Sequence, residues 1–281
     1  MSHFSVLVIG NNPEKALAPY HEFECTGIND AYIQEIDISE EVRGDIESQG
    51  SIEEAVIYNL GDDSIVSDES ELDLNDQHKF GYAVVRNGEL IKAVRRTNPN
   101  KKWDWYVLGG RWEGFFLHKN GMRVNVLRKG ELDIAGMVSN KAILAKREYE
   151  SFSSAISGHD FPRTWSSVRE EFNNDGIEKA REIYHAQPAI KALRDRGIDR
   201  ILGCVVEYFG NNEQDFVIRQ ANSVLSAYSI IHENTWIAKG EMGWFGISDD
   251  NLTQEEWNDK VSELITSLSD DTLLSLFDCH I

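Results

Sequence analysis

The sequence predicts an α+β protein whose sheet is mixed or mainly antiparallel. Three observations support this: apolar, strand-like runs at both ends of the chain, two hairpin patterns in its first half, and a long helical block between them. Strands and helices do not alternate in the regular rhythm of a doubly wound fold, which favours the α+β class.

Both ends of the chain predict buried, central strands. Residues 4–9 form an apolar run rich in valine, which is typical of a strand covered on both faces. Gly10 ends this run, and Pro13 can open a short helix. Residues 273–281 are equally apolar and run to the last residue, and such a terminus is normally tied into a sheet.

Two further segments predict β-hairpins. In residues 80–96, Asn87-Gly88 separates two apolar runs, which is the strongest short hairpin signal. In residues 114–128, apolar and polar side chains alternate after Asn120-Gly121, so one face of the hairpin is buried and the other faces water.

Helices account for most of the remaining chain. Ser51 with Glu54 and Thr253 with Glu256 are capping boxes that each begin a helix. Residues 131–196 form a helical block, which is a candidate insertion, and residues 201–209 return to strand. Residues 61–78 are acidic and aperiodic, which predicts a mobile surface loop. No linker divides the chain, so we expect one α+β domain over residues 1–281.

Charge is distributed unevenly over the 281 residues. The net charge is −20, with −16 in residues 1–80, +7 in residues 81–150 and −11 in residues 151–281. Phosphate contacts dominate nucleic-acid affinity, so we expect no direct nucleic-acid binding from so acidic a chain. The basic middle segment could still form a local anion site.

The chain shows no signal for a membrane, a metal or a disulfide. No stretch approaches the roughly 20 apolar residues that a span needs. Three cysteines, Cys25, Cys204 and Cys279, cannot all pair, so we expect free thiols and a cytoplasmic protein. No zinc-type spacing such as CxxC or HExxH occurs, and the sequence leaves any cofactor open.

The first candidate site is an aromatic block around two adjacent glycines. Aromatic rings stack on bases, a Gly-Gly turn lets backbone N–H groups approach an anion, and arginine offers a planar fork to phosphate. The alternative is a tight turn with core tryptophans, in which Arg111 pairs with Asp104. The candidate ligand-binding residues are Trp103, Asp104, Trp105, Tyr106, Gly109, Gly110, Arg111 and Trp112.

Two other segments suggest catalysis. His21 and Cys25 are four residues apart, and a histidine beside a cysteine can generate a thiolate nucleophile, although a structured acidic loop with a buried cysteine fits as well. In the last strand, alternation places Asp278 and His280 on one face, where His3 approaches if the first strand lies alongside. An Asp–His pair can act as a base and its orienting group, or simply finish a buried strand.

Three stretches resemble a family of uncharacterised proteins encoded by tailed bacteriophages and some bacterial genomes. They are the HFSVLVIG start, the WDWYVLGGRW block at residues 103–112 and the DCHI ending. The resemblance implies a phage accessory protein in the host cytoplasm, a setting in which proteins often act on host immune signalling through small nucleotides.

Three functional hypotheses follow. The first is counter-defence: a protein that binds or cleaves a nucleotide-like anionic small molecule through residues 103–112. The second is a hydrolase or transferase that uses His21 and Cys25, assisted by His280. The third is an acidic interaction protein that mimics a polyanion and blocks a host protein, with residues 30–76 as the mimic. The sequence does not decide whether the protein is an enzyme.

Overall fold

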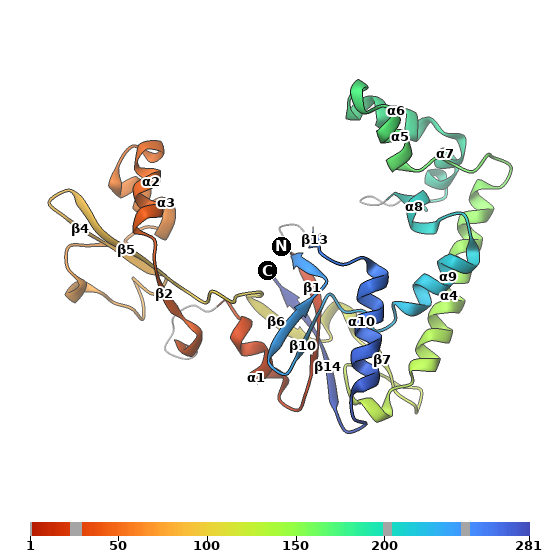
Figure 1. Cartoon of the computed structure of the whole chain (residues 1–281), viewed down its shortest axis with the longest axis horizontal. Coiled ribbons are helices and arrows are strands. Elements are labelled where there is room, and N and C mark those ends of the chain that lie inside the picture. The colour runs from red at the N-terminus through yellow and green to blue at the C-terminus, as the bar shows by residue number, and fades with distance from the viewer. Residues whose placement is uncertain (1, 23–29, 199–203, 243–247) are drawn as a thin grey trace. The chain divides into compact units, whose positions relative to one another are not determined.

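The computed structural model describes residues 2–22, 30–198, 204–242 and 248–281 (Figure 1). The chain divides into two compact units. The first unit comprises Met1–Phe115, Ala227–Asn251 and Thr272–Ile281, and the second comprises Phe116–Ser226 and Leu252–Asp271. Helices and mixed sheets together confirm the predicted α+β class.

Five strands of the first unit form a mixed sheet in the order β11-β10-β1-β14-β6. Their bounds are β1 His3–Ile9, β6 Trp105–Leu108, β10 Ser229–His232, β11 Thr235–Ala238 and β14 Leu273–His280. β1 pairs parallel with β10 and antiparallel with β14. The two strands from the chain ends therefore lie side by side inside the sheet, which confirms the prediction that they are central.

One face of this sheet carries an aromatic core. Short helical turns, α1 Pro13–Leu17 and η1 Ala18–Tyr20, follow β1 and contribute Leu17 to it. Alternation along β1 selects the even-numbered side chains for this face. The buried members are Phe4, Val6, Val8, Leu17, Trp103, Ile231, Phe277 and Cys279. A separate ribbon pairs β12 Gly240–Met242 with β13 Ser248–Asp250.

A second sheet of the first unit has the order β2-β5-β4-β3. Its elements are η2 Asp30–Tyr32, β2 Gln34–Asp37, α2 Ser39–Gln49, α3 Ile52–Leu60, β3 Ile65–Val66, η3 Glu69–Glu71, β4 Gly81–Arg86 and β5 Glu89–Thr97. The turn residues Asn87 and Gly88 have φ of 52° and 79°, as a type I′ turn requires. The predicted hairpin at residues 80–96 is confirmed.

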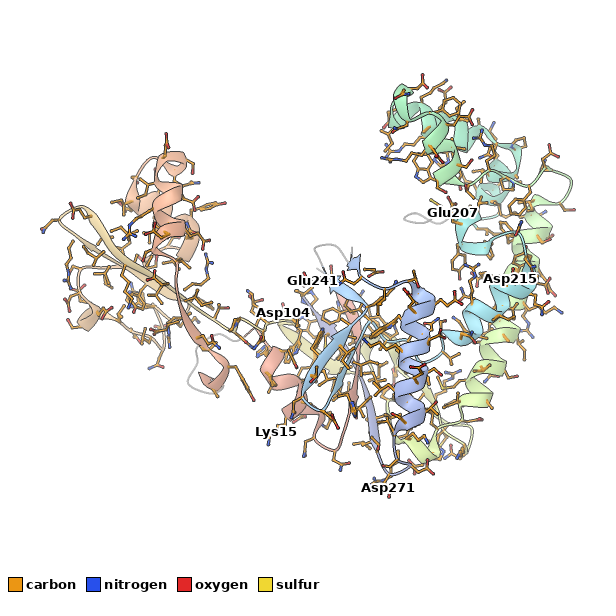
Figure 2. The ribbon with its side chains drawn as sticks, in the orientation of Figure 1. Lys15, Asp104, Glu207, Asp215, Glu241 and Asp271 are labelled. Carbon is orange, nitrogen blue, oxygen red and sulfur yellow. The ribbon has the colours of Figure 1, made fainter. Side chains whose placement is uncertain are left out.

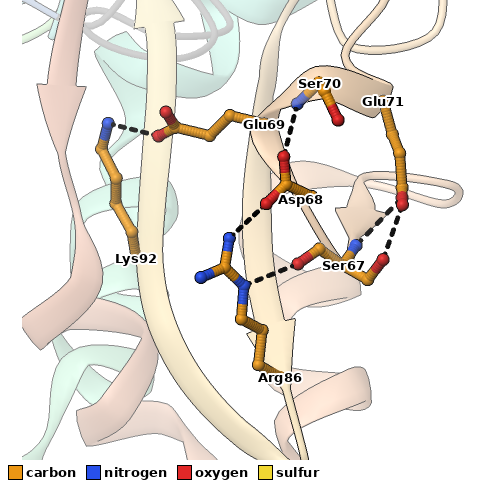
Figure 3. A network of polar contacts seen from close by, with 7 residues as sticks. All are labelled: Ser67, Asp68, Glu69, Ser70, Glu71, Arg86 and Lys92. Atoms are coloured by element: carbon orange, nitrogen blue, oxygen red, sulfur yellow. Dashed lines mark hydrogen bonds and ion pairs between the residues drawn. The ribbon is translucent and has the colours of Figure 1, made fainter.

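The acidic segment at residues 61–78 packs on this second sheet. Leu72 and Leu74 lie against a buried cluster that includes Tyr82 and Val84, so the segment covers the face opposite the helices. Polar contacts extend from the same segment to β4 and β5 (Figure 3). The residues drawn there are Ser67, Asp68, Glu69, Ser70, Glu71, Arg86 and Lys92. Exposed ion pairs of this kind contribute at most about 1 kcal/mol each, so the leucines anchor the segment.

The second unit is mainly helical. It contains β7 Phe116–Leu117, β8 Arg123–Val124, β9 Val126–Arg128, η5 Lys129–Glu131, α4 Ile134–Ile156, α5 Trp165–Glu171, η6 Asn173–Asp175, α6 Ile177–Ala186, α7 Pro188–Asp195, α8 Val205–Phe209, α9 Glu213–Asn222 and α10 Gln254–Ser267. β7 pairs with β8 across Asn120-Gly121, and α4 to α7 span the predicted helical block. Both predictions are confirmed.

The prediction of a strand at residues 201–209 is wrong. Residues 201–203 lie outside the described residues, and residues 205–209 form the helix α8. Val205, Val206 and Phe209 are buried at helical spacing, and Gly210 with φ of 69° ends the helix. A short apolar run fits a buried strand and a buried helix equally well, so periodicity could not separate them.

The last helix follows its sequence signals closely. The Thr253 side chain accepts a hydrogen bond from the Glu256 N–H while the Glu256 carboxylate accepts from the Thr253 N–H, which is the predicted capping box. Trp257, Val261 and Ile265 are buried on one stripe. Among the described helices, none is both long and apolar enough to cross a membrane.

We expect Leu7→Ala to lower the free energy of unfolding by about 2–5 kcal/mol, because it opens a cavity in a close-packed sheet. Leu7 is fully buried in the middle of β1. The matched control is Leu144→Ala on α4, where the side chain is 58% exposed and little packing is lost. Urea unfolding followed by circular dichroism measures both. Equal unfolding midpoints for the two variants would contradict the central position of β1.

Candidate functional site

Two histidines from opposite ends of the chain face each other in the first unit. The antiparallel register of β1 and β14 pairs His3 directly with His280. Since side chains alternate along a strand, Asp278 lies on the same face as His280, while Cys279 points into the aromatic core. The condition under which His3 was expected to approach this end of the last strand is therefore met.

Each histidine is held by its own aspartate. His3 Nδ1 lies 2.8 Å from Asp278 Oδ1. His280 Nδ1 lies 2.8 and 3.0 Å from the two carboxylate oxygens of Asp104, which precedes β6 and is labelled in Figure 2. The ring centroids of the two histidines are 5.1 Å apart. Within the described part of the chain neither Nε2 forms a hydrogen bond, so each ring keeps one nitrogen for chemistry.

The two aspartates differ in their exposure to water. The side chain of Asp278 is 3% exposed and that of Asp104 is 42% exposed. A buried carboxylate needs hydrogen-bond donors to offset its lost hydration. Asp278 has two: His3 on Oδ1 and the backbone N–H of Arg111, which lies 3.0 Å from Oδ2. Asp278 is thus a buried carboxylate with a hydrogen-bond donor on each oxygen.

Two glycines bring the backbone of residues 109–111 close to Asp278. Gly109 has φ of 75° and ψ of −67°, the values of a rare γ-turn, and begins the 3-10 turn η4 Gly110–Trp112. Gly110 has φ of 51°, and a Cβ built on it would lie 2.5 Å from Asp278 Oδ2. The Gly-Gly pair expected to admit a ligand instead admits a carboxylate of the same chain.

Trp105 supplies an aromatic wall beside both imidazoles. Its ring is stacked on His280, with centroids 5.1 Å apart and an interplanar angle of 17°, and it meets His3 edge-on at 5.3 Å. Its backbone N–H donates to Asp104 Oδ1 at 2.8 Å, which also orients that carboxylate. Trp105 remains 44% exposed, so aromatic surface next to the site is open to solvent.

His21 reaches the same aspartate from the other side. Its Nε2 donates to the Asp104 carbonyl oxygen over 2.7 Å, and its ring stacks on Trp103 with centroids 4.3 Å apart. Asp104 therefore contacts His21 through its backbone and His280 through its side chain. Cys25, the proposed partner of His21, lies outside the described residues.

The other residues of the aromatic block have mixed positions. Trp103 is buried in the core, and Tyr106 packs on the same core, where burial raises the pKa of its hydroxyl. Trp112 is half-buried. The Arg111 side chain is exposed and has no partner among the described residues, so it does not pair with Asp104. Burial also raises the pKa of the Cys279 thiol, which makes that cysteine a poor nucleophile.

Sequence reasoning missed two links in the site. It did not pair Asp104 with His280, and it assigned Arg111 a role through its side chain alone, whereas its backbone N–H holds Asp278. Both links join residues more than 160 positions apart, and only the register of β6 on β14 brings them together. No spacing within the sequence signals such a pairing.

The described residues contain no group of three or more His, Cys, Asp or Glu side chains suited to hold a metal ion. Neither a family model nor a curated protein nor a solved structure matches this chain. Two imidazoles that each have a carboxylate partner on Nδ1 and keep Nε2 unbonded are an arrangement that general acid–base catalysis can use.

We expect Gly110→Ala to lower the free energy of unfolding by about 1–3 kcal/mol more than Gly88→Ala, because its Cβ would displace the buried carboxylate of Asp278. Both glycines have positive φ, but a Cβ on Gly88 would meet nothing within 4 Å. Gly88→Ala thus measures backbone strain alone. Urea unfolding of both variants gives the comparison, and equal losses would show that the turn does not restrain Asp278.

Proposed function

We propose that this protein cleaves a phosphate ester in a nucleotide-like small molecule by general acid–base catalysis. The observation that carries the proposal is the pair of His–Asp units with ring centroids 5.1 Å apart. One imidazole can remove a proton from the attacking oxygen while the other gives a proton to the leaving oxygen. Each aspartate fixes the orientation of its ring through Nδ1 and stabilises the imidazolium that forms.

Charge and aromatic surface next to the site support an anionic, planar substrate. The guanidinium of Arg111, exposed and without a partner in the described residues, can accept a phosphate in a planar fork. Lys101, which pairs with Glu22, and Lys102 precede Asp104 in the chain and belong to the one segment with a positive net charge. The open surface of Trp105 can stack on a base.

The resemblance to phage-encoded proteins supports a setting for this chemistry. A small signalling nucleotide made by an infected host cell has the charge, the aromatic base and the phosphate ester that such a site requires. Removal of that signal is the biological role we propose.

We expect His3→Gln and His280→Gln each to lower kcat for a mixture of dinucleoside monophosphates by about 10²–10⁴-fold, because each removes one proton-transfer group and the alkoxide leaving group needs a proton. Chromatographic separation of the products measures the rates.

The matched control is His159→Gln, which changes an exposed histidine in the second unit and should leave kcat unchanged. Thermal unfolding of each variant measures how much of it is folded at the assay temperature, so a loss of kcat can be told apart from a loss of folded protein. If both site variants kept wild-type activity, or lost it only in proportion to lost folded protein, the pair would have a structural role alone.

We expect Arg111→Ala to raise KM by about 10–100-fold with a smaller effect on kcat, because a charge-assisted hydrogen bond to an anion contributes about 1.5–3 kcal/mol. Arg111→Lys should recover part of the loss. Arg169→Ala on α5, also an exposed arginine, is the control. Steady-state kinetics provide both constants, and an unchanged KM in Arg111→Ala would remove this side chain from substrate binding.

A further inference from the structure

We propose that the substrate carries its own nucleophile: a ribonucleotide phosphodiester whose 2′-hydroxyl attacks the adjacent phosphorus. This inference rests on the proposed function and narrows it to a substrate class. Two observations support it. The two imidazoles can transfer protons, and no hydroxyl, thiol or amine of the described residues bonds to either ring.

The protein presents no nucleophile to the imidazoles. In the described residues the hydrogen-bond partners of the His3 and His280 imidazole rings are carboxylates alone. No Ser, Thr, Cys or Lys side chain in that part of the chain bonds to either ring, although nucleophile activation depends on such a contact. Cys279, adjacent in sequence, points into the opposite core. The attacking oxygen therefore comes from water or from the substrate.

The expected rate accelerations favour the substrate, and not water, as the source of the attacking oxygen. General acid–base catalysis contributes about 10²–10⁴-fold for each positioned proton transfer. Water attack on a phosphodiester is among the slow reactions for which enzymes must supply far larger accelerations. A neighbouring hydroxyl in the same molecule adds an effective molarity of about 10⁵–10⁸ M, because the nucleophile is already in place. A ribose hydroxyl beside the phosphate therefore makes two imidazoles sufficient.

The step balances without any further reactant. One Nε2 takes the proton of the 2′-hydroxyl as the 2′-oxygen forms its bond to phosphorus. The bond from phosphorus to the 5′-oxygen breaks, and the other Nε2 gives its proton to that oxygen. The products are a 2′,3′-cyclic phosphate and an alcohol. Neither oxidation nor reduction occurs, and the two rings have exchanged protonation states.

Such a reaction fits the arrangement of the pair. Both rings bond to their aspartates through Nδ1, so Nε2 is the nitrogen that each ring keeps for proton transfer; His280 as a whole is 5% exposed. Either ring can serve as base in one direction and as acid in the other, as reopening of the cyclic phosphate by water requires. Trp105, stacked on His280, lies where a base next to the reacting ribose could stack.

The test compares three substrates: all ribodinucleoside monophosphates as a mixture, the corresponding 2′-deoxy mixture, and bis(p-nitrophenyl) phosphate. We expect the ribo mixture to react at least about 100-fold faster than the deoxy mixture. Mass spectrometry should detect 2′,3′-cyclic phosphate products. His3→Gln and His280→Gln, purified in the same way, should form none, whereas His159→Gln should match the wild type; this excludes a contaminating nuclease.

The outcomes separate the two proposals. Equal rates on the ribo and deoxy mixtures, dependent on both histidines, would overturn the internal nucleophile and leave the acid–base function intact. Product without a cyclic phosphate at any time would do the same. No histidine-dependent activity on any of the three substrates would overturn the proposed function together with this inference.

Discussion

The pairing of β1 with β14 is the constraint on which the rest of the first unit depends. It joins the first and last strands of the chain over seven residue pairs, from His3 with His280 to Ile9 with Leu274. This register determines which side chains lie on each face of the sheet. On one face it inserts Phe4 and Cys279 into the aromatic core, and on the other it sets two imidazoles 5.1 Å apart. A slip of one residue would exchange these faces, moving the histidines into the apolar core, so the hydrophobic pattern also fixes the polar site.

Burial of the Asp278 carboxylate between the strands costs free energy. Removing a carboxylate from water costs several kcal/mol unless donors replace the water. Two donors offset this cost: the His3 ring and the backbone N–H of Arg111, which the γ-turn at Gly109 directs toward Asp278. Asp104 is arranged differently, since its side chain stays partly in water. It has three hydrogen-bond partners: the Trp105 N–H and His280 on its carboxylate, and His21 on its carbonyl. These supports keep both imidazoles oriented without any contribution from a ligand.

The site also unites the three stretches that stood out in the sequence. The first strand supplies His3, the aromatic block supplies Asp104 and Trp105, and the last strand supplies Asp278 and His280. Acidic residues of the N-terminal part of the chain lie elsewhere, at the second sheet. Ion pairs such as Asp68 with Arg86 and Glu41 with Arg95 balance part of their charge within the second sheet. The residues that suggest ligand chemistry thus belong to one sheet of the first unit, and these ion-paired acidic residues lie at the other sheet.

The sequence by itself determined the local elements. Apolar runs, Asn-Gly turns and the Thr253 capping box each depend on a few neighbouring residues, so they could be predicted from those residues alone. The helix at residues 205–209 could not be predicted in this way, since a short, mostly apolar segment has no distinctive period. The site was decided only by tertiary structure. Asp104 and His280, or Arg111 and Asp278, are joined by strand register across most of the chain. Sequence alternation could place Asp278 and His280 on one face, but only pairing between distant strands could choose their partners.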